Sequence, residues 1–330
     1  MHTVMHTVAT ARSTRRTQVV TSGLGDRLRL LAAAALIGCA GLSAGCGGDF
    51  SPPSLVETVR VLGVRATPPY LPTSPATTTT IEAKVVGVSP GQPLCHTWGL
   101  CVLTTQQNGQ FSCLAPELQL NLGTTATVEV RFDQVLQLSL QAKDYLVAQG
   151  LGGGGSQPAP NEPPPSQLIK LVFGIGERDA FADGCPKDIS AFLAGGCDDR
   201  ERCVIGSKSL RAFTSGLEQH TNPTLTGMTI GGQESVDGVT LAVPAGDVEL
   251  VPTWSADSIE PRPADGGPKT ESLLMSWFST AGTYDKQRSF DDVPANGITL
   301  SATDEEVSVW VVVRDGRGGV DWLERRIRAE

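Results

Sequence analysis

The chain has 330 residues, of which 40% are hydrophobic, 18% charged and 5% aromatic, with 37 Gly, 22 Pro and a formal net charge of −9. A collagen-like or disordered chain is excluded, because apolar residues are plentiful and no Gly-X-Y period exists. The length suits two domains of roughly 100–170 residues. Low charge with abundant Gly, Pro and Thr favours loop-rich β structure.

The charge is unevenly distributed along the chain. Residues 1–45 hold five arginines and one aspartate, a net +4, which leaves −13 for residues 46–330. The basic stretch precedes a short Ala-rich apolar run at residues 30–37, the pattern of an export signal. A membrane-spanning helix needs about 20 strongly apolar residues, so this run fits one poorly. We therefore expect residues 1–45 to be a signal peptide.

Two cysteines lie where a lipoprotein signal peptidase could cut. Cys39 follows Leu-Ile-Gly, a good lipobox, whereas Cys46 follows Leu-Ser-Ala-Gly, a looser one. Cleavage before Cys46 leaves six further cysteines that can all pair, while cleavage before Cys39 leaves an odd thiol. We predict Cys46 as the lipidated residue, with Cys39 as the alternative and secretion without lipid as the third reading. Residues 46–54 then form a tether.

The residue after Cys46 and the net charge of the predicted mature protein indicate where it is located and which partners are excluded. Gly47, in place of Asp after Cys46, gives no signal for retention at the inner membrane, so we expect the outer membrane, on its periplasmic or surface face. A charge of −13 excludes nucleic acid as a partner, because that binding needs a basic patch. The expected partners are the membrane, through the N-terminal lipid, and an envelope protein or glycan.

Alternating and β-branched segments predict a first β-sandwich-like domain over residues 55–215. We expect strands at residues 56–66, 77–88, 94–104, 125–132 and 168–175. Residues 135–149 fit either a strand or a helix, and residues 186–194 fit a short helix. The Gly- and Pro-rich residues 150–166 predict a flexible loop inside this domain.

Cysteine parity supports one cross-linked first domain. The six cysteines expected to form disulfides fall into two groups of three, namely Cys95, Cys101 and Cys113, and then Cys185, Cys197 and Cys203 in a Cys-rich segment at residues 185–203. Three cysteines cannot all pair among themselves, so at least one bond must join the two groups. Each bridge contributes roughly 2–4 kcal/mol.

Residues 222–330 predict a second, immunoglobulin-like sandwich. Seven short strands are expected, at residues 224–230, 239–243, 248–254, 273–279, 298–301, 307–314 and 320–328. The sequence Asp-Gly-Arg-Gly-Gly at residues 315–319 predicts the hairpin that joins the last two. Four tryptophans are expected to fill the core of this unit, Trp254, Trp277, Trp310 and Trp322.

Four short motifs resemble a group of uncharacterised Gram-negative lipoproteins with Ig-like domains. They are Cys-Gly-Gly-Asp-Phe-x-Pro-Pro-Ser from Cys46, R-V-L-x-V-R-A-x-P-P at residues 60–69, W-F-S-T-A-G at residues 277–282, and V-V-V-R-D-G-R-G-G-V-D-W at residues 311–322. The resemblance implies a lipid-anchored, exported protein with two Ig-like or fibronectin-type β-sandwich domains. It implies no catalytic residues.

Patterns that suggest chemistry have simpler explanations. G-x-S-x-G at residues 41–45 lies in the predicted signal, and G-x-G-x-x-G at residues 150–155 lies in the predicted loop. The Cys-rich segment lacks zinc-knuckle spacing, so disulfides are favoured there, and we expect no cofactor. His220 is interpreted as a linker residue. A weak calcium hypothesis rests on four carboxylates, those of Asp179, Asp183, Asp198 and Asp199.

The sequence therefore predicts a lipid-anchored envelope or cell-surface protein with a non-catalytic binding or scaffolding role. The alternative is an accessory subunit of an envelope enzyme or transporter that binds glycan or peptide. A third interpretation, an unrecognised hydrolase, is disfavoured because no acid, base and nucleophile set stands out, although such groups need only meet in space.

Overall fold

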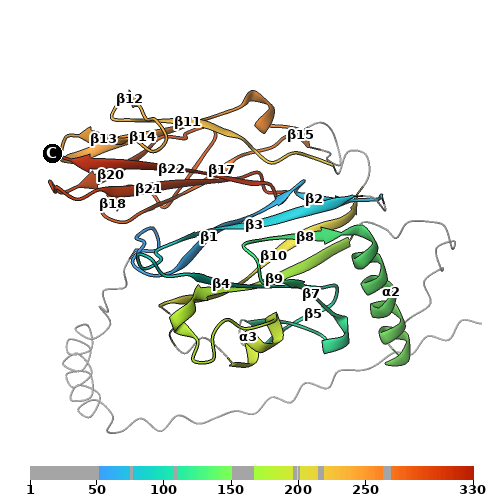
Figure 1. Cartoon of the computed structure of the whole chain (residues 1–330). Helices are drawn as coiled ribbons and strands as arrows, with labels where there is room; N and C mark the ends of the chain where they lie inside the picture. The colour runs from blue at the N-terminus through green and yellow to red at the C-terminus, as the bar shows by residue number, and fades with distance from the viewer. Residues whose placement is uncertain are drawn as a thin grey trace, which may run out of the picture. The chain divides into compact units, whose positions relative to one another are not determined.

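The computed structural model describes residues 52–74, 77–107, 110–150, 167–195, 199, 201–214, 219–262 and 269–330. The predicted signal peptide, most of the tether and nearly all of the Gly- and Pro-rich loop lie outside these ranges. So do four residues singled out from the sequence, namely Cys39, Cys46, Cys197 and Asp198. The described chain is mainly β, in two sandwiches (Figure 1).

The first sandwich pairs a three-stranded sheet with a five-stranded one. The smaller sheet has the order β1 (Arg60–Thr67), β3 (Thr78–Val86) and β8 (Thr127–Arg131). The larger has the order β2 (Tyr70–Pro72), β10 (Cys203–Thr214), β9 (Gln167–Glu177), β4 (Leu94–Cys101) and β7 (Gln119–Gly123). A separate hairpin and two 3-10 turns complete it, β5 (Thr104–Gln107), β6 (Gln110–Cys113), η1 (Pro116–Leu118) and η2 (Arg178–Ala180).

The core of this sandwich comes from alternate residues of both sheets. Side chains of β1, β3 and β8 meet those of β2, β4, β9 and β10 around the fully buried Trp98. The α-helix α2 (Phe132–Ala148) closes one end, burying Phe132, Val135 and Leu138. The segment that fitted either a strand or a helix is thus helical, since Phe132, Val135 and Leu138, at a spacing of three, share the helix face that reaches this core.

Strand β9 is buried on both faces from Leu171 onward. Ile169, Leu171, Phe173 and Ile175 point into the core, while Val172 faces a second apolar cluster on the outer side of the sheet. That cluster includes residues of the chain between β9 and β10, called here the Cys-rich excursion, with its short helix α3 (Ile189–Gly195). Burial on two faces explains why this half of the strand has no polar alternation.

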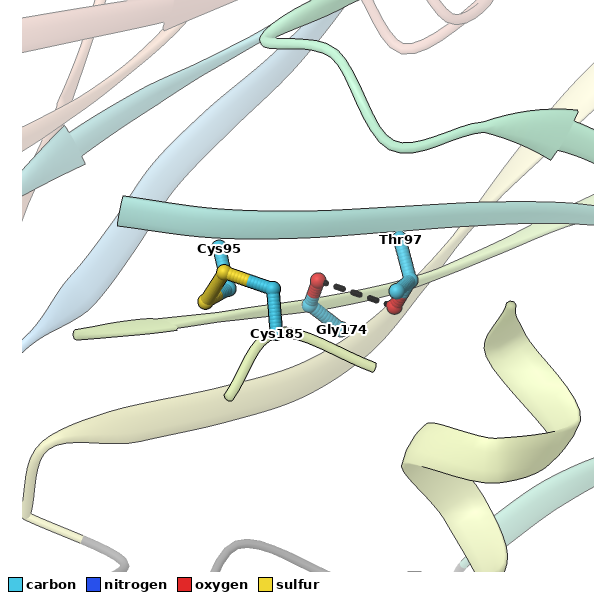
Figure 2. Close-up of a disulfide and its surroundings, with 4 residues drawn as sticks. All are labelled: Cys95, Thr97, Gly174 and Cys185. Atoms are coloured by element: carbon cyan, nitrogen blue, oxygen red, sulfur yellow. Dashed lines mark hydrogen bonds between the residues drawn. A yellow bond between two sulfur atoms is a disulfide. The ribbon is translucent and has the colours of Figure 1, made fainter. Parts of the chain in front are cut away.

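Glycines let the excursion lie directly against the sheet. A Cβ on Gly174 of β9 would come within 2.5 Å of the Phe192 ring of α3, and one on Gly99 of β4 within 2.4 Å of Ile189. Beside this contact, Thr97 donates a hydrogen bond to the Gly174 carbonyl over 3.2 Å (Figure 2). The helix therefore packs onto backbone that carries no side chain.

One disulfide fastens the Cys-rich excursion to β4, and a second joins the end of β4 to the end of β6. Cys95 on β4 bonds to Cys185, which joins the two cysteine groups across 90 residues (Figure 2). Cys101 bonds to Cys113 within the first group. Cys203 is also disulfide-bonded.

The second sandwich has two five-stranded sheets. One has the order β12 (Gln233–Glu234), β11 (Leu225–Ile230), β14 (Gly246–Trp254), β20 (Asn296–Leu300) and β18 (Thr283–Tyr284). The other has the order β13 (Thr240–Val243), β22 (Val320–Ala329), β21 (Val307–Arg314), β17 (Leu274–Ser279) and β19 (Arg288–Phe290). A ribbon and a turn lie beside them, β15 (Pro261–Arg262), β16 (Lys269–Thr270) and η4 (Ala256–Ser258).

The tryptophans divide between two environments, which corrects part of the sequence interpretation. Trp277 is 1% exposed in the core of the second sandwich, and Trp254 packs against that core. Trp310 and Trp322 instead join a cluster with β1 residues of the first sandwich. They are packing residues, but they connect the two sandwiches.

The strands expected from alternation or from β-branched runs are present, with ends shifted by a few residues. The sequence prediction missed the twelve-residue strand β10, because it begins inside the Cys-rich segment and has three polar residues at its centre, Ser207, Lys208 and Ser209. It also missed β2, whose three residues pair in parallel with β10.

We predict that Gly174→Ala destabilises the first sandwich. The added methyl must displace the buried Phe192 ring, and overpacking of this kind costs about 1–3 kcal/mol. Urea unfolding should show that loss as a lower midpoint. Gly227→Ala on β11, whose Cβ would meet only the Thr253 hydroxyl at 3.1 Å, is the matched control and should lose less. Equal losses would contradict the packing argument.

Candidate functional site at the junction of the two sandwiches

Two of the sequence motifs meet at the junction of the two sandwiches. Residues 60–69 form β1 and the turn after it, and residues 311–322 form most of β21, the hairpin loop and the start of β22. Strand β1 contacts β22 across the junction. The two motifs are about 250 residues apart in sequence, and the fold brings them together at one place.

An apolar cluster forms the centre of this junction. Leu62 of β1 and Val86 of β3 pack against Trp310 and Val312 of β21, all of them nearly buried. Gly63 permits this close approach, because a Cβ there would lie 3.1 Å from a methyl group of Val320. Burying a large apolar side chain contributes roughly 1.5–3 kcal/mol, so this cluster alone is a substantial link.

Charged side chains surround the apolar cluster and pair across it. Arg65 of β1 donates to Asp321 of β22 over 2.7 Å and to Glu82 of β3 over 2.7 Å. The Arg65 guanidinium also lies 4.4 Å from the centre of the Trp322 ring, a cation–π contact. Asp321 is only 13% exposed and accepts a second hydrogen bond, from the Leu225 N–H. This carboxylate therefore joins β1, β22 and β11.

The predicted hairpin between β21 and β22 is present, and its loop is organised by one carboxylate. Asp315, 3% exposed, accepts hydrogen bonds from the N–H groups of Arg317, Gly318 and Gly319 at 2.8, 3.0 and 2.9 Å. Gly316 and Gly318 have φ of 76° and 120°, conformations that favour glycine. A loop that folds around the buried Asp315 therefore needs glycines at the two positions of positive φ, and the Asp-Gly-Arg-Gly-Gly sequence supplies them.

Arg317 projects from this loop into a pair of carboxylates. It is 12% exposed and pairs with Glu260 over 2.8 Å and with the buried Glu271. Burial raises the pKa of Glu271, with the Arg317 charge acting against it. Burial also opposes ionisation of Glu260, but hydrogen bonds from Thr221 and Arg317 lower its pKa. The Arg317 guanidinium is thus the shared ion-pair partner of Glu260 and Glu271.

His220, interpreted from the sequence as a linker residue, lies in the segment between β10 and β11 and is buried in the same region. It is 6% exposed, with its Nε2 atom 3.7 Å from the Asp315 carboxylate and its ring 5.7 Å from the Tyr70 ring. Two residues on, Asn222 donates to the Ala66 carbonyl over 2.8 Å and accepts from the Val320 N–H over 3.0 Å. The segment between the sandwiches is therefore bonded to both of them.

Lys208 of β10 contributes a further contact across the junction. Its amine donates a 2.6 Å hydrogen bond to the Gly318 carbonyl of the hairpin loop. Burial lowers the pKa of Lys208 to about 8; the Asp315 charge acts against this shift and the Arg314 charge adds to it.

Of the four carboxylates of the calcium hypothesis, Asp198 lies outside the described residues, and the other three are not part of any group that could hold a metal ion. Asp183 is exposed, and Asp179 lies 4.0 Å from Arg202. Arg202 makes its shorter contact, 2.6 Å, with the buried Glu177, whose pKa is lowered chiefly by the Ser89 N–H hydrogen bond. Within the described residues no group of three His, Cys, Asp or Glu side chains could hold a metal ion. Nor is any helix there long and apolar enough to cross a membrane.

The arrangement at the junction is suited to rigidity. Its charged groups Arg65, Arg317 and Lys208 are engaged with carboxylates or with backbone carbonyls. Sequence reasoning found the two motifs through a resemblance but did not bring them together. A useful signal was the surplus of apolar residues in the strand at residues 307–313, which has no solvent-facing alternation.

No protein-family model and no curated protein matches the chain. Among solved structures it is similar to the D0–D1 domain of intimin, with 10% identity, 82% of this chain and 99% of that chain covered, and a TM-score of 0.21. It is also similar to fibronectin(III)-like modules of Clostridium thermocellum CbhA, with 9% identity, coverage of 81% and 94%, and a TM-score of 0.20. For the FN1–FN3 domains of chicken CNTN1 the identity is 8%, the coverage 83% and 68%, and the TM-score 0.21. At these TM-scores, function must be argued from the chain's own residues.

We predict that Lys208 makes stability rise with pH in the alkaline range. Its pKa is about 8 in the fold against 10.5 for a free lysine, so the unfolded chain binds the extra proton between these values. The fold is therefore penalised below pH 8, and the penalty is relieved as pH rises towards 10.5.

Urea unfolding of the wild type and of Lys208→Met at pH 7 and pH 10 measures this effect. The wild type should gain about 2–3 kcal/mol more than the variant over that interval. Lys143→Met on the exposed face of α2 is the control and should behave as the wild type does. Parallel pH profiles for all three proteins would contradict the assignment.

Proposed function

We propose that this chain is a non-catalytic, lipid-anchored scaffold of the bacterial envelope, exported by residues 1–45 and held at the membrane through Cys46. The observation that carries the scaffolding role is the junction, where an apolar cluster, the Arg65–Asp321 pair and the bonded segment around Asn222 fix the two sandwiches to each other. A hinge-closing role would favour a looser, more polar joint between the sandwiches.

The anchoring half of the proposal rests on the sequence. A basic head, an apolar run and a cysteine followed by a short Gly- and Pro-containing tether are the pattern of an exported lipoprotein. A mature charge of −13 gives the protein surface little attraction for anionic lipid, so the lipid chains would supply the attachment. Several acyl chains are enough for stable anchoring.

A distance measurement tests the stiffness of the scaffold. Spin labels on cysteines introduced at Glu129 of β8 and Glu249 of β14, both exposed, report the separation of the sandwiches. With native disulfides intact, we expect one narrow distance distribution. Asp321→Ala leaves Arg65 and the Leu225 N–H without this acceptor, so we expect it to lower the unfolding free energy by about 2 kcal/mol and to broaden the distribution.

The matched control for Asp321→Ala is Asp292→Ala, an exposed residue of the second sandwich. It should leave both the distance distribution and the stability unchanged. A broad distribution in the wild type would show that the sandwiches move independently, and the scaffold proposal would then be wrong.

Metabolic labelling with a palmitate analogue tests the anchor. We expect the wild type and Cys39→Ser to carry the label and to partition into detergent, whereas Cys46→Ser should lose both properties. Label that persists in Cys46→Ser and disappears in Cys39→Ser would move the site to Cys39. A wild type without label would overturn the anchor altogether.

A further inference from the structure

An open groove of about 710 Å³ lies at one end of the second sandwich. Its walls are the turn between β17 and β18, the end of β20, the loop after it and the first residues of β21. The lining residues are Leu55, Thr280, Ala281, Gly282, Thr283, Thr299, Leu300, Ser301, Thr303, Glu305, Glu306, Val307 and Ser308. Its volume lies within the about 300–1,000 Å³ of ordinary ligand sites.

The polar side chains of the lining are hydroxyls and carboxylates, with no cationic group among them. Six of its side chains are hydroxyls and two are carboxylates, while Lys, Arg, His and aromatic residues are absent from it. A ligand with phosphate or carboxylate groups would therefore meet acceptors without a cation. A sugar ring would find no aromatic face to stack on. The groove fits a ligand that is rich in hydrogen-bond donors and carries positive charge.

The two carboxylates differ in availability. Glu306 already pairs with Arg326 over 3.5 Å and accepts a hydrogen bond from Thr240. Glu305 is exposed, and no described side chain makes a hydrogen bond or ion pair with its carboxylate. Glu305 is thus the group at the groove that can accept a cation without breaking an existing pair.

The strand at the edge of this sheet has a free side beside the groove. Strand β18, whose Thr283 lines the groove, is last in the sheet order and pairs with β20 on one side. Gly282, in the turn before β18, has φ of 90°, and a Cβ there would come within 2.8 Å of Leu300 and 2.9 Å of the Thr299 carbonyl, so the turn lies against β20 and requires glycine. A free sheet edge suits an extended peptide better than a compact small molecule.

We propose that this groove binds an extended, lysine- or arginine-bearing peptide segment, with Glu305 as the principal acceptor of its charge. One wall is formed by Leu55, which pairs with Ser279 as the chain enters the fold. Leu55 is nine residues from Cys46, at most about 30 Å of extended chain. The position of the peptide close to the membrane rests on the proposed lipid anchor; the binding itself does not.

Isothermal titration of the mature chain carrying Cys46→Ser tests the proposal without lipid. The probes are a capped hexapeptide alternating Lys and Thr, its Glu and Thr counterpart, spermidine, and a neutral glucan oligosaccharide. We expect the lysine peptide to bind most tightly and to weaken as salt rises from 0.05 to about 0.5 M, since exposed charges are screened.

Variants locate the binding. Glu305→Gln should weaken the lysine peptide about two- to fivefold, the range for an exposed ion pair. Ser301→Lys, which places a cation in the lining, should weaken it further. Glu234→Gln, on β12 at the opposite edge of the sheet, is the matched control and should have no effect. Thermal unfolding of each variant checks that the fold is intact.

Several outcomes would overturn the proposal. These are equal binding of the two hexapeptides, no binding of the lysine peptide, tighter binding of spermidine or the oligosaccharide, and an equal effect of Glu234→Gln and Glu305→Gln. None of them changes the distance between the sandwiches or the lipid labelling. Failure of the groove and failure of the scaffold are therefore distinguishable.

Discussion

Burial of β21 on both of its faces is the constraint on which the rest of the second sandwich and the junction depend. Val307, Val309, Val311 and Val313 point into the core of the second sandwich, while Trp310 and Val312 point at β1 and β3 of the first. A sheet with two dry faces cannot tolerate the polar alternation of a surface strand. Consequently the first sandwich has to cover this sheet, and the two are not independent modules on a flexible linker.

The loop at the end of β21 shows how polar groups are satisfied next to this dry interface. A buried loop has backbone N–H groups that need acceptors, and Asp315 supplies one carboxylate for three of them. That frees Arg317 to reach two acids and leaves the Gly318 carbonyl for Lys208. Burial of the Lys208 ammonium group lowers its pKa, so its charged form destabilises the fold. Its hydrogen bond to the Gly318 carbonyl nevertheless links the loop to the first sandwich.

The sequence was informative where a local pattern decides the structure, and silent where distant segments meet. Alternation identified β1 and β8, β-branched residues identified β3, and the loop at residues 315–319 was predicted from its glycines. Strand β10 was missed because its pairing with β9 is set by tertiary contacts. The groove was missed as well, because its lining comes from Leu55 and from two separate segments, residues 280–283 and 299–308, whose hydroxyl residues look ordinary along the chain.

The entry of the chain into the fold links the anchor, the junction and the groove. Ser54 and Val56 make backbone hydrogen bonds with Ser279 of β17, at 3.0 and 2.8 Å, although the next strand, β1, belongs to the first sandwich. The N-terminal segment therefore crosses from one sandwich to the other within a few residues, and Val56 is itself part of the apolar cluster between them. With the lipid anchor proposed above, a load on the tether would act on both sandwiches at their junction. The Arg65–Asp321 pair joins β1 to β22 there and would oppose their separation.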